Sequence, residues 1–305
     1  ISHADSLGTT DGATTVASGA ALNISGGITT AAEGITISGT GVSNRGAIRS
    51  VSGNNTIAGQ ITIAAHTEIA SDSGTLTLNI SSGSSITASN KNVTFDGAGN
   101  ITVADPIATG SGTLTKSGSG TLTLSAANTY TGATTVSAGV LAISHADSLG
   151  TTDGATTVAS GAALNISGGI TTAAEAITIS GTGVSFRGAI RNTSGDNTYS
   201  GAITLGANTE IRSDSGTLTL NVASGSAIAA SNKNLTFDGS GNITVADPIA
   251  TGSGTLSQTG NGTLTLSAAN TYTGATTISD GTLAISNATG LEQLMPQQLL
   301  LQVLH

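Results

Sequence analysis

The sequence has no cysteine and no tryptophan, and it holds only 3 prolines among 305 residues. The lack of cysteine excludes disulfide bonds and thiolate metal sites. Only 8% of the residues are charged, against about 25% in an ordinary globular domain. The chain is nevertheless 37% hydrophobic, mainly Ala, Val, Ile and Leu. This composition differs from that of disordered chains and suits tightly stacked strands.

Positive charge is scarce as well, with 8 Lys+Arg against 17 Asp+Glu and a net charge of −9. Nucleic-acid binding needs a basic face, so we expect no nucleic-acid partner. No apolar run reaches 18 residues, so we expect no membrane-spanning helix. The sequence starts inside a repeat, without an initiating Met or a signal peptide, and we expect it to be a piece of a longer protein.

A long tandem repeat dominates the chain. Residues 1–142 return as residues 143–284 without gaps and with 117 of 142 positions identical, and residues 285–291 begin a third copy. We therefore expect two repeat domains, 1–142 and 143–284. Such an array builds length and surface without requiring a unique active site.

A shorter period lies inside each copy. Apolar residues alternate with Thr or Asn in short runs such as Ile35-Thr-Ile37 and Leu122-Thr-Leu124, and Gly, Ser, Asn and Asp separate the runs. This pattern predicts half-buried strands joined by turns, in either a sandwich or a solenoid. The tandem repetition, the few large aromatics and the few prolines favour an all-β parallel solenoid with coils of roughly 20–24 residues.

One segment in each copy resembles a known family. Gly112 to Leu141 contains Gly-Thr-Leu-Thr-Leu, then Asn-Thr-Tyr-Thr-Gly, then Thr-Thr-Val-Ser-Ala-Gly-Val-Leu, and the segment returns at 254–283. It is similar to the autotransporter-associated β-strand repeat. The resemblance implies a right-handed parallel β-helix from the passenger region of a Gram-negative surface protein. It also implies an extracellular location and a role as an adhesin or a stalk.

The leading hypothesis is therefore a structural or adhesive extracellular stalk that is not an enzyme and needs no cofactor or metal. Its partners would be host cells, glycans or other copies of itself. Two alternatives remain open at this stage. One is a carbohydrate-active β-helix, either a polysaccharide lyase or hydrolase or a lectin, and the other is an ice-binding β-solenoid.

Several residues could carry the alternative chemistry. Ser2, His3 and Asp5 have the residue types of a catalytic triad, but neighbours along a strand point to opposite faces, so we interpret them as a turn. Paired carboxylates can cleave glycosides, yet Asp96, Asp105 and their counterparts Asp238 and Asp247 lie in turn contexts. No calcium-binding motif is present in the sequence.

The differences between the copies cluster at 44–70 and 186–212, and loops carry recognition. We therefore predict a contact belt there, made of Arg45, Arg49, Arg187, Arg191, Phe186 and Tyr199. Tyr130 and Tyr272 could stack on a sugar, although a role at the edge of a coil is the preferred interpretation. Pairs such as Thr75/Thr77 and Thr121/Thr123 would bind ice only if they aligned over many coils.

Residues 292–305 break the repeat. With one choice of codons, a single-base shift turns this tail into Gly-Thr-Thr-Asp-Ala-Ala-Thr-Thr-Val-Ala-Ser-Gly-Ala-Ala, which differs at one residue from the expected continuation. We interpret the tail as an out-of-frame reading of the next copy. A short amphipathic capping helix is the alternative.

Overall fold

The computed structural model describes residues 1–287 and divides the chain into two compact units, Ile1–Gly154 and Ala155–His305. Within residues 1–287 each unit is a parallel β-solenoid, which confirms the predicted fold class. The sequence repeats 1–142 and 143–284 remain a prediction as domains. The end of the third copy beyond Asn287 and the tail 292–305 lie outside the described residues.

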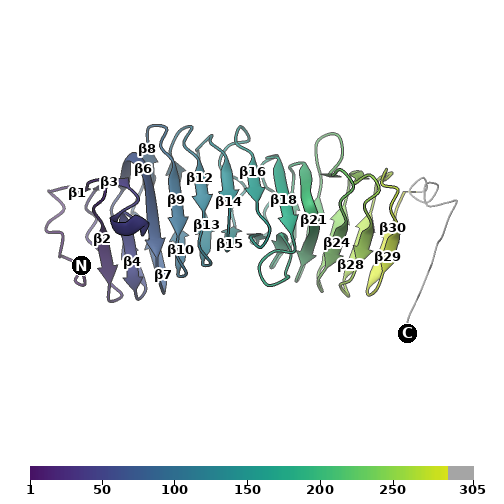
Figure 1. Ribbon diagram of the computed structural model, residues 1–305, viewed down its shortest axis with the longest axis horizontal. Helices are drawn as coiled ribbons and strands as arrows, with labels where there is room; N and C mark the ends of the chain where they lie inside the picture. The colour runs from purple at the N-terminus through teal and green to yellow at the C-terminus, as the bar shows by residue number, and fades with distance from the viewer. Residues whose placement is uncertain (288–305) are drawn as a thin grey trace. The chain divides into compact units, whose positions relative to one another are not determined.

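Within unit 1 the short strands lie side by side (Figure 1). They are β1 Thr14–Val16, β2 Leu22–Ser25, β3 Ile35–Gly39, β4 Ile48–Ser52, β5 Asn55–Ile57, β6 Ile61–Ser71, β7 Thr75–Leu78, β8 Ile86–Ala88, β9 Val93–Asp96, β10 Asn100–Val103, β11 Ile107–Ala108, β12 Leu114–Lys116, β13 Thr121–Leu124, β14 Thr134–Val136 and β15 Val140–Ile143. One 3-10 turn, η1 Val42–Asn44, interrupts them.

Unit 2 repeats this order of strands. They are β16 Thr156–Val158, β17 Ala163–Ile166, β18 Ile177–Gly181, β19 Ile190–Asn192, β20 Asn197–Tyr199, β21 Ile203–Ser213, β22 Thr217–Leu220, β23 Ile228–Ala229, β24 Leu235–Asp238, β25 Asn242–Val245, β26 Ile249–Ala250, β27 Leu256–Gln258, β28 Thr263–Leu266, β29 Thr276–Ile278 and β30 Thr282–Ile285.

A coil consists of two or three short strands joined by turns. Strands β10, β11 and β12 form one coil, after which β13 returns onto β10 with Leu122 opposite Ile101. The number of residues in a coil varies. Leu141 lies opposite Leu122, which is 19 positions earlier, whereas Ile61 lies opposite Ile35, which is 26 positions earlier. The coils thus span a wider range than the 20–24 residues expected, and the longer ones carry the protruding loops.

The core of each unit is a set of inward-facing columns. In unit 1 one column runs through Ile48, Ile69, Phe95, Lys116 and Val136, each opposite the next. The apolar members of this column are fully buried. Because successive residues of a strand point to opposite faces, the intervening Thr and Asn residues lie outside.

Asparagine side chains fix the turns between coils. Asn54 Oδ1 accepts a hydrogen bond from the Thr75 amide at 3.0 Å, and Asn100 Oδ1 accepts one from the Thr121 amide at 3.0 Å. Each side chain satisfies a backbone donor at the start of the strand stacked on it, where the ladder has not yet begun. The turn residues of the sequence therefore connect successive coils.

Candidate interaction surface

The exposed large apolar side chains of residues 1–287 lie on equivalent loops of the two units. Val42 is 57% exposed in η1, between β3 and β4, and Phe186 is 79% exposed between β18 and β19. Figure 1 shows the first of these loops, with η1, in front of the neighbouring strands. An exposed aromatic side chain at a loop tip is a typical contact residue.

These loop tips also have an unusual backbone. Ser43 and Asn44 have φ values of 56° and 55°, and Ser185 and Phe186 have 54° and 58°. Asn tolerates this left-handed conformation, whereas for a bulky residue it is strained. In unit 2 the exposed Phe186 therefore has a left-handed backbone conformation, which is unfavourable for phenylalanine.

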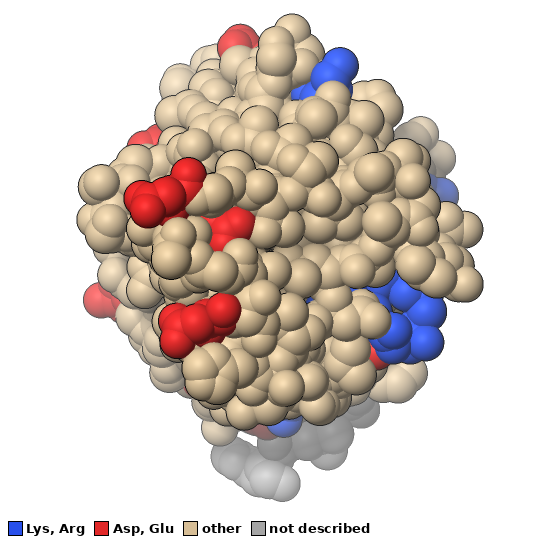
Figure 2. Space-filling view, turned by 90° about the vertical axis from the view of Figure 1, so that its left-hand side faces the viewer, with Lys and Arg blue, Asp and Glu red and all other residues tan. Residues whose placement is uncertain are grey.

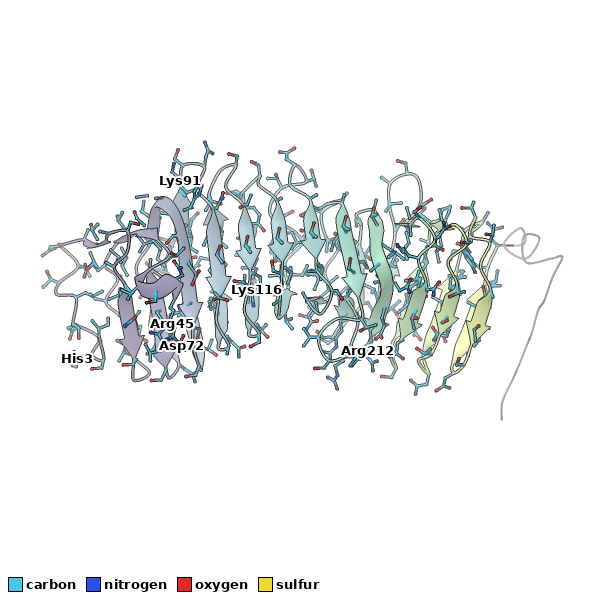
Figure 3. All side chains as sticks on the ribbon, viewed as in Figure 1. His3, Arg45, Asp72, Lys91, Lys116 and Arg212 are labelled. Atoms are coloured by element: carbon cyan, nitrogen blue, oxygen red, sulfur yellow. The ribbon has the colours of Figure 1, made fainter. Side chains whose placement is uncertain are left out.

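An ion-pair cluster lies beside the loop in unit 1. Asp72 follows β6 and pairs with Arg49 of β4, and Arg45 Nη2 at the edge of the loop lies 3.3 Å from Asp72 Oδ2. Arg45 is labelled close to Asp72 in Figure 3. Hydrogen bonding to Asp72 raises the pKa of Arg49. The cluster ties the loop to the neighbouring coil.

Unit 2 has a longer ion-pair chain at the equivalent place. Arg191 Nε donates to Asp214 Oδ2 at 2.7 Å, Arg212 Nε donates to Asp214 Oδ1 at 2.8 Å, and Arg212 also pairs with Asp238. Burial alone would raise the pKa of Asp214, but the hydrogen bonds from both arginines outweigh it and lower that pKa. Three successive coils are linked by alternating charges.

The predicted contact belt is only partly at the surface. Arg45, Phe186 and Arg187 are exposed on the two loops, and Arg49 and Arg191 are half-buried in the ion-pair clusters. Tyr199 does not belong to a contact face, which corrects that part of the prediction. Its side chain is fully buried and its hydroxyl donates to the Glu175 carbonyl at 2.8 Å. The ring fills the core column where the first copy has Ile57, also fully buried.

The residues of triad type form a local turn. The Asp5 amide donates to His3 Nδ1 at 3.2 Å, and the Asp147 amide donates to His145 Nδ1 at 3.1 Å. Ser148, rather than the Ser144 of the motif, bonds the His145 amide through its hydroxyl. In both copies the imidazole Nδ1 thus accepts a hydrogen bond from a backbone amide, and no hydrogen bond to the serine of the motif is found among residues 1–287.

The carboxylates considered for glycoside chemistry lie apart from one another. Asp96 and Asp238 end β9 and β24, and Asp105 and Asp247 lie in the bends after β10 and β25. Asp105 Oδ2 accepts the Ile80 amide at 2.7 Å, and Asp247 Oδ2 accepts the Val222 amide at 2.7 Å. Asp96 Oδ1 accepts the Ser117 hydroxyl at 3.0 Å, and Asp238 pairs with Arg212. Each carboxylate joins two coils, Asp105 and Asp247 from the expected turns and Asp96 and Asp238 from the ends of strands.

Tyr130 and Tyr272 lie in the interior of their units. Tyr130 is 0% exposed and Tyr272 9%, and their hydroxyls lie 2.8 Å from Thr134 Oγ1 and Thr276 Oγ1 respectively. A ring buried this deeply does not offer a face to a sugar. The sugar-stacking role considered for them is therefore wrong for Tyr130.

Threonines form single columns on the outer faces. Thr56, Thr77, Thr102 and Thr123 stand opposite one another on successive coils, and Ala142 follows. The position two residues earlier changes from Thr75 to Asn100 to Thr121. The face therefore has one threonine column where a flat ice-binding array would need two.

The sequence patterns did not reveal the partners of the arginines. Asp72 lies 23 positions after Arg49, which is one coil along the chain. The length of the coil is the signal that could have identified these pairs, because residues one coil apart in sequence lie side by side. The Ser-Asp-Ser-Gly segment at 71–74 and 213–216 marks the same position in both copies.

Other ionisable groups lie inside the units. Burial raises the pKa of Glu175 to about 7, against the lowering effect of the Thr156 hydroxyl, and burial together with Asp96 raises that of Glu68 to about 7. Burial lowers the pKa of Lys116 to about 8, although Asp96 opposes the shift. No cluster of three or more potential metal ligands occurs among residues 1–287, and no helix there is long and apolar enough to cross a membrane.

Comparison with known families finds the passenger-associated-transport-repeat at residues 114–143 and 256–285. The two matches occupy the same strands of each unit, from β12 to β15 and from β27 to β30. They confirm the resemblance to an autotransporter passenger region. No significant match is found among curated proteins or among solved structures.

Proposed function

We propose that the chain is a stalk with adhesive loops in the passenger region of a secreted, surface-associated autotransporter. The observation that carries the proposal is the passenger-associated-transport-repeat in the same strands of both β-solenoid units. The scarcity of charge supports it too, because only 8% of the residues are charged, and Figure 2 shows few charged groups on the N-terminal end of unit 1. A passenger of this kind acts through its surface and its stiffness.

The physical basis is a weakly binding loop that occurs once on each of two β-solenoid units of the same chain. Backbone ladders join each coil to the next, and the aliphatic columns exclude water between them. Val42 and Phe186 project from equivalent loops of the two units. Weak contacts repeated along one support strengthen each other through effective concentration, so no single contact has to be tight.

The proposal is tested by displaying the 305-residue chain on a Gram-negative cell through a heterologous export signal and outer-membrane anchor. We expect intact cells to become protease-sensitive at the chain and to adhere more strongly to host-cell layers, glycan arrays or one another. A double variant, Val42→Ser with Phe186→Ser, should lower adhesion while display is unchanged. Normal display without any gain in adhesion would contradict the adhesive role.

A further inference from the structure

Unit 1 has a surface hollow of about 270 Å³ that the repeat pattern does not explain. It is lined by Arg45, Ala70, Asp72, Asp96, Gly97 and Ala98. The carboxylates of Asp72 and Asp96 belong to adjacent coils, and Ala70 stands opposite Asp96 in the ladder. At the ladder position opposite Asp96 the first copy therefore offers only the methyl group of Ala70, while Arg45 lines the hollow on the side of Asp72.

The second copy shows what fills the same place there. Arg212 stands where the first copy has Ala70, opposite Asp238 just as Ala70 is opposite Asp96. Its guanidinium donates to Asp214 Oδ1 at 2.8 Å and also pairs with Asp238. One planar cation therefore bridges the two carboxylates that correspond to Asp72 and Asp96.

The backbone around the two positions is the same. A Cβ added at Gly46 would lie 2.9 Å from Ala70 Cβ, and one added at Gly188 would lie 2.9 Å from Arg212 Cβ. Arg49 stands opposite Ala70 in one ladder and Arg191 opposite Arg212 in the other. The hollow is thus the second copy's arginine site without the arginine side chain.

The ion pairs of the neighbouring arginines Arg45 and Arg187 differ between the two copies. In unit 1 Arg45 lies against Asp72, but its ion pair does not extend to Asp96. In unit 2 Arg212 takes the corresponding place at Asp214, and Arg187 makes no salt bridge within residues 1–287. Asp96 keeps the Ser117 hydroxyl at 3.0 Å and has no salt bridge within the same range.

We propose that this hollow of unit 1 binds a guanidinium group, which bridges Asp72 and Asp96 as Arg212 bridges Asp214 and Asp238. A guanidinium is planar and carries several donors, so one group can reach two carboxylates, whereas an ammonium is a compact point charge. The group can come from an arginine side chain of another polypeptide or from a free guanidinium compound. This site goes beyond the stalk function and does not depend on it.

The test uses the whole chain and two probes, ethylguanidinium and the peptide acetyl-Gly-Arg-Gly-amide, with ethylammonium as the comparison cation. Backbone amide shifts are followed by nuclear magnetic resonance at low ionic strength, because surface ion pairs are screened by salt. Both guanidinium probes should shift amides near Ala70 and Gly97. Ethylammonium should bind at least several-fold more weakly, and equal binding would overturn the guanidinium assignment.

Variants then test whether the probe binds in the hollow. Ala70→Arg, which restores the residue of the second copy, should abolish the shifts, and Asp96→Asn should reduce the association constant about tenfold or more. Arg212→Ala should create a second set of shifts in unit 2. Circular dichroism checks that each variant is folded, and Asp96→Asn serves where Ala70→Arg does not fold. Unchanged binding to a folded Ala70→Arg or Asp96→Asn protein would overturn the proposal.

Discussion

The ammonium group of Lys116, inside a core column of unit 1, shows that this fold buries a residue type that sequence rules place at the surface. The Lys116 side chain is only 3% exposed, and its Nζ donates to the carbonyls of Gly118 at 2.8 Å and Ala138 at 3.3 Å and to that of Ser117. In the second copy Gln258 Nε2 donates to the carbonyls of Gly260 at 2.8 Å and Gly262 at 3.2 Å. The column needs a donor at this position, and either residue supplies it.

We predict that Lys116→Gln leaves the protein folded, whereas Lys116→Met lowers the free energy of unfolding by about 2 kcal/mol, because buried carbonyls lose their donor.

The wild type should gain stability as the pH rises from about 8 to 10.5, since the folded Lys116 has a pKa near 8 and the unfolded state therefore binds the proton more tightly. Urea denaturation across this range checks both points. A wild-type slope that survives in Lys116→Gln would contradict the assignment.

Replacing Phe186, at the tip of the loop in unit 2, is predicted to stabilise the protein rather than destabilise it. Phe186→Asn should raise the free energy of unfolding by about 1 kcal/mol, because Asn tolerates the φ of 58° and the exposed ring loses little burial. The reverse change, Asn44→Phe, should destabilise, and it also removes the 2.6 Å bond from the Thr40 hydroxyl to Asn44 Oδ1. Urea midpoints of both variants decide it, and a destabilised Phe186→Asn would contradict the strain argument.

At the scale of the strand and turn, glycines allow the coils to stack closely. A Cβ added at Gly120 would lie 1.9 Å from the Gly99 carbonyl oxygen of the previous coil, whereas nothing lies within 4 Å of one added at Gly34. The second copy has Gly262 at the first position and Ala176 at the second. At these two positions the copies agree where a methyl group would clash and differ where it would not.

We predict that Gly120→Ala destabilises by about 3 kcal/mol or more, because the added methyl group forces apart the coils carrying β10 and β13. The matched control, Gly34→Ala, should be neutral or slightly stabilising, since it removes freedom from the unfolded chain. Thermal unfolding followed by circular dichroism measures both variants. Equal stability of the two would show that the coils do not stack as described.

How much the sequence reveals differs between strands and side-chain partners. Alternation in Ile35-Thr-Ile37 and Leu122-Thr-Leu124 predicts strands with one buried face, and both runs are strands with buried apolar residues. The difference between Ile57 and Tyr199 favoured a contact face, although the aliphatic residue at this place in the first copy is the signal for a core position, and both side chains are fully buried. The Arg49–Asp72 pair needed the coil length as well, and that length varies from coil to coil.

At the scale of the whole molecule, the scarcity of charge makes a few buried carboxyl groups important. Burial raises the pKa of Glu68, Glu175 and Glu210 to about 7 each, with Asp96 and Asp238 adding to the shifts of Glu68 and Glu210. Each side chain also has a buried oxygen without a hydrogen-bond partner among the described residues. The folded protein therefore favours the protonated form of these groups.

We predict that the protein is more stable near pH 5 than near pH 8. A carboxyl whose folded pKa is about 7 binds its proton more tightly than in the unfolded chain, so its contribution is lost as the pH rises through 7. Falling pH also reduces the net charge of −9, which acts in the same direction. The triple variant Glu68→Gln, Glu175→Gln, Glu210→Gln separates the two effects, because glutamine has no proton to lose. Melting temperatures from pH 5 to pH 8 should fall in the wild type and change much less in the variant, and an equal fall in both would assign the pH dependence to net charge instead.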